Sequence, residues 1–387
     1  MAPVHFRRCP HCQLPHEVGI AACPFTDKPL FDTETTRRAT DDLGLVGTRL
    51  DDKYQVLEEI GRGATGRVYR AEHVRIGREV ALKVLLGELA RSPRVRDRFL
   101  REAQATGRVE HANVVQIWDV GLTSDGLPFM VMELLRGEPL SKRLARERRL
   151  PLGVALRVAA QVLEGLAAAH AAEVIHRDVK PENVIVLGEE RVKLVDFGVA
   201  RLLDAAALAI TGRGDLVGTP AYVAPELASG GAVGAACDAW AATVMLYEMV
   251  VGELPFAGGT VVEQLAAIAH AAPTPPSQAR SYLPPRLDGV IASGLAKDPD
   301  ARATVPALLE MLRRLERELE GRVPVETGEE AASNADTAPS ADTLPTTDTL
   351  PTTGARTPRR AHFADTLREP PSVLDTIVLD SGDEPLD

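Results

Sequence analysis

The sequence contains no run of 18 or more apolar residues, which is about the length that a membrane-spanning helix requires. Its most apolar segment, WAATVMLYEMVVG, is too short for a span and indicates a buried core helix. The first residues, MAPVHFRRCPHC, also lack the apolar centre of a secretory signal. These absences predict a protein without a membrane span and with a cytoplasmic location.

Cysteine is scarce as well, and acidic residues outnumber basic ones. Only four cysteines occur, and three of them fall within the first 23 residues, which favours metal ligation over a disulfide framework. The formal net charge is −11 at pH 7, which argues against a general nucleic-acid binder. We therefore expect proteins, and no nucleic acid, as binding partners.

The clustered cysteines give residues 1–31 the spacing of a small zinc-ribbon-like unit. A histidine completes the pattern C-x₂-C-x₃-H-x₆-C, whose candidate ligands are Cys9, Cys12, His16 and Cys23. Structural Zn²⁺ sites are four-coordinate and include Cys₃His sets, and a unit this small would have little core without metal. His11 and Asp27 are weaker substitutes for His16, and the alternative is a ribbon that has lost its metal.

The rest of the chain divides into a linker, a folded domain and a tail. Residues 32–53 are polar and are expected to form a linker, while residues 54–317 carry strand patterns first and long helix-prone segments afterwards. Residues 318–387 are rich in Thr, Pro, Asp and Ala and repeat DTLPTT in tandem at 342–353. From residue 326 onward, 13 acidic residues face four arginines, which predicts disorder.

Glycines near residue 61 suggest a phosphate-binding loop. GRGATGRVY places Gly61, Gly63 and Gly66 where backbone N–H groups can approach phosphate oxygens closely. The same spacing opens dinucleotide-binding units, but there a helix follows, whereas here the strand-like VYRAEH and EVALKVL follow. The sequence therefore predicts glycines that bridge two antiparallel strands.

Lys83 lies inside the second of these strands, between aliphatic neighbours. It is either an edge residue whose ammonium reaches solvent or a buried cation that needs an anionic partner. The glycine loop upstream favours the buried cation, with Glu102 of the following helix and bound phosphates as partners.

Five motifs, GRGATGRV, VALK, HRDVKPEN, DFG and APE, occur in the order and spacing of the protein kinase family. Over about residues 54–316 the chain resembles bacterial serine/threonine protein kinases. The resemblance implies an α+β, two-lobed kinase fold with a β-rich N-lobe and an α-rich C-lobe. It also implies an ATP-dependent phosphotransferase that uses Mg²⁺ and acts on Ser and Thr of protein substrates.

The resemblance assigns roles to individual residues. Asp178 would orient the substrate hydroxyl, Lys180 would reach the γ-phosphate, and Asn183 and Asp196 would bind Mg²⁺. VIVLGEERVKLV is expected to form a hairpin that returns Asp196 towards Asn183. The ATP-binding set, in which backbone groups of two hinge residues hold the adenine, is Gly61, Gly63, Gly66, Val68, Lys83, Glu102, Glu133 and Leu135.

The same resemblance suggests how activity is controlled. An arginine at the position of Arg177 is typical of those kinases whose loop between DFG and APE is commonly phosphorylated. We therefore expect autophosphorylation at Thr211 and a structural role for Thr219. Glu226 and Arg302 resemble a buried ion pair that braces this loop. One departure is Thr243, which stands where the family usually has Gly and could crowd a helix packing site.

Two other functions remain as alternatives. The chain could be a nucleotide-binding scaffold without catalysis, although Lys83, Asp178, Asn183 and Asp196 are all intact, or a kinase of small molecules, although GTPAYVAPE resembles a peptide-docking loop. Threonines of the tail could bind phosphothreonine-recognition partners or belong to a solvating spacer. The pattern does not choose between these two roles, nor does it give the oligomeric state.

Overall fold

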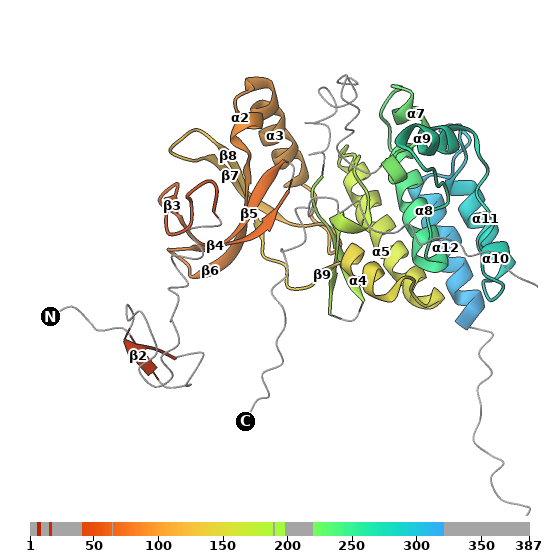
Figure 1. Ribbon diagram of the computed structural model, residues 1–387, viewed down its shortest axis with the longest axis horizontal. Helices are drawn as coiled ribbons and strands as arrows, with labels where there is room; N and C mark the ends of the chain where they lie inside the picture. Colours follow the sequence, from red (N-terminus) through yellow and green to blue (C-terminus); the bar gives the residue numbers. More distant parts are fainter. Residues whose placement is uncertain are drawn as a thin grey trace, which may run out of the picture.

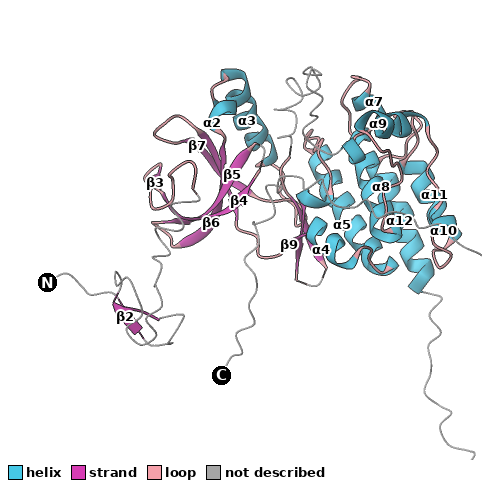
Figure 2. Cartoon of the chain, in the orientation of Figure 1, coloured by secondary structure: helices cyan, strands magenta, loops and turns pink. Residues whose placement is uncertain are grey.

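The computed structural model describes the backbone of residues 6–8 and 15–17 and then residues 41–63, 65–188, 190–197 and 220–320. Figure 1 shows two lobes, a sheet with two helices on the left and a larger group of helices on the right. Figure 2 separates the strands of the first lobe from the helices of the second by colour. The predicted β-rich N-lobe and α-rich C-lobe are therefore confirmed.

The N-lobe is built on one antiparallel sheet with the strand order β3-β4-β5-β6-β8-β7. Alternating apolar residues of the strands cover a core that contains Tyr54, Val56, Tyr69 and Leu82. A second core lies between the sheet and helix α3. The elements of this lobe are β3 (Arg49–Leu50), β4 (Tyr54–Arg62), β5 (Gly66–His73), β6 (Arg78–Leu85), α2 (Gly87–Ala90), α3 (Pro93–Thr106), β7 (Ile117–Leu122) and β8 (Pro128–Glu133).

Part of the predicted linker belongs to this lobe. Residues 41–50 run along the edge of the sheet, where β3 pairs with β4 and the side chains of Leu45 and Leu50 enter the core. The carboxylate of Asp41 is buried and accepts hydrogen bonds from the backbone N–H groups of Leu43 and Val46. The prediction of a linker up to residue 53 is therefore wrong from Asp41 onward, because apolar side chains among the polar ones anchor the segment.

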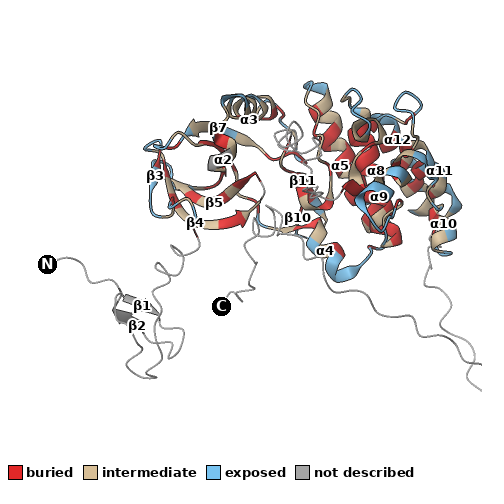
Figure 3. Ribbon diagram, turned by 45° about the horizontal axis from the view of Figure 1, so that its top comes forward, coloured by how far each residue is buried: buried red, intermediate tan, exposed pale blue. Residues whose placement is uncertain are grey.

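The C-lobe packs its helices around α5 and α8, and Figure 3 shows buried residues concentrated in both. Helix α8, which contains WAATVMLYEMVV, is buried on nearly all sides, as the sequence predicted. Besides a short hairpin, the lobe consists of α4 (Leu140–Glu147), α5 (Leu152–Ala171), η1 (Pro181–Asn183), η2 (Pro220–Tyr222), α7 (Pro225–Ala228), α8 (Ala236–Val251), α9 (Val261–His270), α10 (Pro276–Ala279), α11 (Pro285–Gly294) and α12 (Val305–Glu320). The hairpin comprises β10 (Val184–Leu187) and β11 (Arg191–Leu194), with β9 (Glu138–Pro139) beside β10.

Helix α5 is long and apolar enough to cross a membrane by length and composition. The segment is not an uninterrupted apolar run, because it contains Arg157 and Glu164. In the structure α5 packs against β11, α8 and α12, and its apolar side chains belong to the C-lobe core. Its hydrophobicity is thus explained by the fold.

Residues near the N-terminus are described only as a backbone hairpin of β1 (Phe6–Arg8) and β2 (Pro15–Glu17). The predicted zinc ligands Cys9, Cys12 and Cys23 lie outside the described residues, as does the side chain of His16. Where side chains are described, no cluster of three or more His, Cys, Asp or Glu could hold a metal. The zinc site stays a prediction. The predicted boundary of the tail is three residues too early, because α12 continues to Glu320, and the rest of the tail lies outside the described residues.

Candidate active site

The glycine-rich segment joins β4 to β5, which pair antiparallel with Arg62 opposite Arg67. The backbone N–H of Gly63 donates to the carbonyl of Gly66 at 3.0 Å and closes the turn. A side chain at residue 66 would bring its Cβ within 2.6 Å of the Val84 carbonyl oxygen, so only glycine fits there. The prediction that these glycines bridge two antiparallel strands is confirmed.

Lys83 lies in β6, and its side chain is 1% exposed. Its ammonium is 2.6 Å from Oδ1 of Asp196, which neutralises a charge that would be costly to bury alone. The prediction of a buried, paired cation is confirmed.

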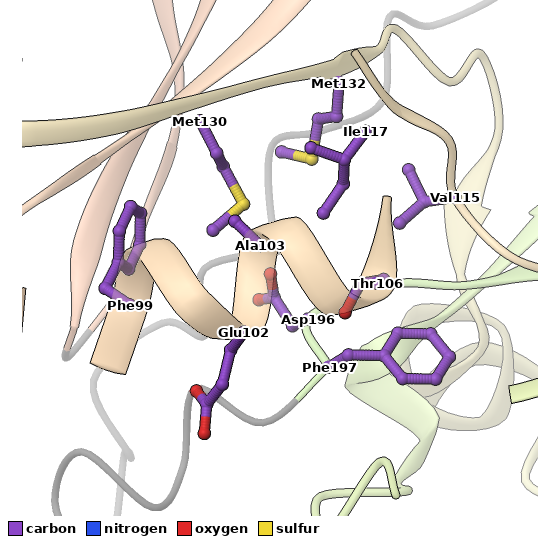
Figure 4. Close-up of a pocket in the computed structure, with 10 residues that line it drawn as sticks. All are labelled: Phe99, Glu102, Ala103, Thr106, Val115, Ile117, Met130, Met132, Asp196 and Phe197. Carbon is purple, nitrogen blue, oxygen red and sulfur yellow. The ribbon is translucent and has the colours of Figure 1, made fainter. Parts of the chain in front are cut away.

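The predicted partner of Lys83 was Glu102, and this pairing is wrong for the structure. Glu102 lies on α3 with its carboxylate 3.6 Å from the guanidinium of Arg177. In Figure 4 its carboxylate points away from Met130 and Met132, which lie on the other side of α3. Asp196 and Glu102 are both candidate partners of the Lys83 ammonium. In the structure Asp196 binds Lys83, and Glu102 lies next to Arg177.

The catalytic loop brings three predicted residues together. Oδ2 of Asp178 lies 2.9 Å from the ammonium of Lys180 and accepts a hydrogen bond of 2.9 Å from the amide of Asn183. The turn η1 makes this possible, because it folds Asn183 back onto the loop, where its amide also donates to the Asp178 carbonyl at 2.7 Å. Burial lowers the pKa of Lys180, but the carboxylates of Asp178 and Glu182 outweigh this and raise it above its ordinary value.

The hairpin β10–β11 places Asp196 beside this loop, as predicted. The strands pair with Val184 opposite Leu194, and the N–H of Val195 donates to the Asn183 carbonyl at 3.0 Å. Because the amide nitrogen of Asn183 is held by Asp178, its oxygen is the atom left to face a cation. A carboxylate and an amide oxygen at adjacent positions fit Mg²⁺, which prefers such ligands.

Asp238 supports the loop from below, a role that the sequence analysis did not assign. Its carboxylate is 1% exposed and accepts hydrogen bonds from the backbone N–H groups of His176 at 2.9 Å and Arg177 at 2.8 Å. The side chain of His170 is a third partner, at 2.8 Å. These bonds hold Arg177 at φ 69°, a left-handed conformation that is costly for a residue other than glycine.

His176 is fully buried beneath the same loop. Its Nε2 is 3.0 Å from the Val195 carbonyl, and its Nδ1 accepts from the N–H of Asp178 at 3.3 Å. Burial lowers the pKa of His176 below its ordinary value, although nearby carboxylates oppose this shift. A neutral ring with a proton on Nε2 satisfies both contacts and links the loop to the strand that precedes Asp196.

An apolar cluster joins the two lobes next to these polar groups. Val68 and Leu135, both predicted to contact ATP, pack with residues of both lobes. The N–H of Glu133 donates to the Gln116 carbonyl at 3.0 Å, and its carboxylate binds Lys193 at 2.5 Å, so these atoms fix the hinge. The cluster comprises Ile60, Val68, Ala81, Val115, Met132, Leu135, Ile185 and Val195.

A small pocket lies behind Asp196 and Phe197, between α3 and β8 (Figure 4). Apolar side chains such as Phe99, Met130 and Met132 line most of it. Glu102 and Asp196, the two candidate partners of Lys83, both line it.

Glu226 and Arg302 form the predicted ion pair. Two guanidinium nitrogens of Arg302 lie 2.7 and 2.8 Å from the two carboxylate oxygens of Glu226. The guanidinium is fully buried and also donates to the carbonyls of Ala236 and Ala296 at 2.9 Å. Thr211 and Thr219, predicted to control the loop, lie outside the described residues.

Comparisons with known proteins agree with this geometry. The protein kinase domain family matches residues 54–312. The serine/threonine-protein kinase pkn3 of Myxococcus xanthus is 36% identical over 70% of this chain and 52% of its own length. The serine/threonine-protein kinase PkaA of Streptomyces coelicolor is 40% identical over 67% of the chain and 49% of its own length.

Solved structures give the same result. The kinase domain of PknI from Mycobacterium tuberculosis aligns with 70% of this chain and 98% of its own length, with a TM-score of 0.56 and 27% identity. The chain matches about half of the length of the two curated relatives. The family match covers more than half of the chain and contains the residues brought together above, so the chain belongs to the protein kinase family.

Proposed function

We propose that the protein is a serine/threonine protein kinase that transfers the γ-phosphate of ATP to Ser and Thr hydroxyls of proteins. The observation that carries this proposal is that two charged groups are held close together by the hydrogen bond of 3.0 Å from the Val195 N–H to the Asn183 carbonyl. Lys83 and Asp196 form one, and Asp178 with Lys180 and Asn183 forms the other. Phosphoryl transfer depends mainly on positioning and on neutralising charge, and these residues supply both.

Each residue has a distinct part in the reaction. Asp178 orients the attacking hydroxyl and accepts its proton, and Asn183 keeps the Asp178 carboxylate in place through a hydrogen bond of 2.9 Å. Lys180 remains cationic, since its pKa is raised, and neutralises the phosphate in transfer. Mg²⁺ held by Asn183 and Asp196 would supply further positive charge when bound.

The preference for Ser and Thr rests on two observations. Lys180 follows Asp178 by two residues, the pattern that resembles Ser/Thr kinases rather than tyrosine kinases. The relatives named above are serine/threonine-protein kinases. Protein substrates are proposed on the same grounds.

The contact between Arg177 and Glu102 supports a proposal for control. A phosphate on Thr211 would carry about −1.5 to −2 charges and would compete with Glu102 for Arg177. This competition would remove one contact that holds Glu102 away from Lys83. We expect preincubation with MgATP to raise the activity of the parent protein and not that of Thr211→Ala. A Thr211→Ala variant that activates like the parent would contradict this mechanism.

Autophosphorylation tests the proposed function directly. The full-length protein, incubated with MgATP, is expected to incorporate phosphate that is detected by intact mass and by mapping. Asp196→Asn and Asp178→Asn should lower incorporation at least about a hundredfold, because each removes a group that acts on the reacting atoms. Asp125→Asn, at an exposed position of the β7–β8 connection, is the matched control and should behave like the parent.

Absence of phosphate in the parent with nucleotide still bound would favour the scaffold instead.

The zinc unit, the phosphothreonine partners of the tail and the cytoplasmic location are further proposals that rest on the sequence. Metal analysis of the full-length protein should find one zinc per chain, and Cys9→Ser should lose it. A metal-free parent would contradict the zinc site.

A further inference from the structure

Two arginines face each other where strands β4 and β5 enter the glycine turn. Arg62 and Arg67 are paired residues of the antiparallel ladder, and like charges at directly opposite positions repel. Two carboxylates compensate for this. Glu59 of β4 approaches the Arg62 Nε within 2.5 Å, and Asp42 reaches both arginines from outside the hairpin, at 3.3 Å from Arg62 and 3.1 Å from Arg67.

Arg67 also holds the turn itself. Its Nη1 donates to the carbonyl oxygens of Gly63 at 3.2 Å and Gly66 at 3.3 Å, while its Nη2 binds Asp42. One guanidinium therefore connects both ends of the glycine turn to a carboxylate outside the hairpin. Because each held carbonyl fixes its peptide plane, the Arg67 contacts restrict the directions of the backbone N–H groups in the turn.

Asp42 can act as an anchor because the residue before it is rigidly held. The buried carboxylate of Asp41 accepts hydrogen bonds from the Tyr69 hydroxyl at 2.7 Å and from the Val46 N–H at 2.7 Å. Burial and this contact raise the pKa of Tyr69, so its hydroxyl remains a donor. The backbone at Asp42 is thus fixed to β5, the strand that continues from the glycine turn.

We propose that Asp42 is a positioning residue for the phosphates of the nucleotide. Acting through Arg67, it holds the glycine turn in the conformation that receives the phosphates, so that less ordering is needed on binding. The inference rests on the proposed function, because it takes ATP to be the ligand of this turn. The bond from Asp42 to Arg67 and the two bonds from Arg67 to the turn together form the Asp42–Arg67 brace.

A simple charge effect predicts the opposite sign. If Asp42 acted only as a negative charge near the phosphates, its removal would tighten the binding of an anionic nucleotide. If the brace orders the turn, its removal weakens that binding. Adenosine has no phosphates for the turn to hold, so loss of the brace should not change its affinity. A general loss of structure would weaken the binding of adenosine and of MgATP alike.

The experiment measures the dissociation constants of MgATP and of adenosine by calorimetry on the full-length protein. Asp42→Asn is expected to weaken MgATP binding about threefold to fivefold and to leave adenosine binding unchanged, a size typical of a partly exposed ion pair. Asp42→Glu should restore most of the affinity. Asp51→Asn is the matched control, since it removes a carboxylate that pairs with Lys53 at 2.7 Å on the same segment, and it should match the parent.

A double-mutant cycle tests whether Asp42 acts through Arg67. Arg67→Met should weaken MgATP binding on its own, and Asp42→Asn should then add nothing to it. Three results would overturn the inference: tighter or unchanged MgATP binding in Asp42→Asn, an equal loss for adenosine, or full additivity with Arg67→Met. A parent protein that binds neither ligand would instead overturn the proposed function, and this inference with it.

Discussion

At the scale of single residues, the site depends on Asp238, a buried carboxylate with several hydrogen-bond partners. Asp238 is 1% exposed, yet its carboxylate has two backbone donors and His170 as partners. Arg177 and Asp196 have φ values of 69° and 63°, conformations that cost roughly 1–3 kcal/mol each. The contacts of Asp238 hold the first of these and so place the backbone that carries Asp178.

The buried His176 predicts a pH dependence of stability. Its pKa in the folded protein lies below the ordinary value of 6.5, so below that pH the unfolded chain takes up a proton that the folded protein does not. The free energy of unfolding therefore falls as the pH drops below 6.5, with a slope that approaches about 1.4 kcal/mol per pH unit until the folded protein itself takes up the proton. Replacing His176 by Phe, which keeps a ring against Phe197, should remove this slope.

Urea denaturation of the parent and of His176→Phe, at roughly pH 7.5 to 5.5, checks the prediction. It gives the slope of the free energy of unfolding against pH for each protein. The absolute stability of the variant will also be lower, since the Val195 carbonyl loses its partner, but the slope is independent of that loss. His270→Gln, at an exposed position, should keep the parent slope. Equal slopes in the parent and His176→Phe would mean that His176 does not resist protonation.

The roles of single residues could be predicted from the sequence, but not all of their partners. Asp178, Lys180 and Asn183 lie within six residues of one another, so one short loop is enough to bring their side chains together. Lys83 has two candidate carboxylates, 19 and 113 residues away in the chain. Which one it binds depends on how α3 packs on the sheet, and a local pattern contains no information on that.

At the scale of elements, the crossing of α8 and α11 shows how an unusual residue is accommodated. Thr243 of α8 stands where the family usually has glycine, and its hydroxyl donates to the Ala239 carbonyl at 2.7 Å. Facing it is Gly294 of α11, where an added Cβ would lie 2.1 Å from the Thr243 hydroxyl. The expected crowding is thus avoided, because the partner helix has no side chain at the crossing.

This crossing gives a prediction for Gly294→Ala. The added methyl group overlaps Thr243, so the variant should lose about 1–3 kcal/mol in its free energy of unfolding. Thr243→Gly should restore part of that loss when combined with Gly294→Ala, although glycine inside α8 costs about 1 kcal/mol by itself.

Gly289→Ala is the matched control in the same helix, since no atom lies within 4 Å of an added Cβ there. It should be neutral or stabilising by up to about 1 kcal/mol in the same urea denaturation. Equal effects of Gly294→Ala and Gly289→Ala would contradict the close contact between α8 and α11.

Elements with a regular period were predictable, whereas the segment before the sheet was not. The glycine hairpin and β10–β11 show strand-like apolar patterns bounded by turn residues, and both were predicted. Residues 41–53, DDLGLVGTRLDDK, have no such period. Their attachment depends on a buried aspartate and two leucines that fit an existing core, which only the folded sheet provides.

At the scale of the whole molecule, the described N-lobe reaches back to Asp41, before the first residue that matches the kinase family. The segment up to Leu50 contributes two core leucines, the bond from Tyr69 to Asp41 and the Asp42–Arg67 brace. Its polar sequence predicted a linker, but its residues pack against the edge of the sheet. The unit that folds is therefore larger than the unit that the motifs define.

Two deletions test this boundary. A protein that lacks residues 1–53 should melt roughly 5–10 °C below one that lacks residues 1–40, because burying Leu45 and Leu50 is worth about 1.5–3 kcal/mol each. Calorimetry of both proteins gives the two melting temperatures. Leu50→Ala in the undeleted chain should lose about 2–4 kcal/mol, so the prediction remains testable if the shorter protein fails to fold. Equal melting temperatures would mean that the leucines add nothing to the core, and the boundary would then return to Tyr54.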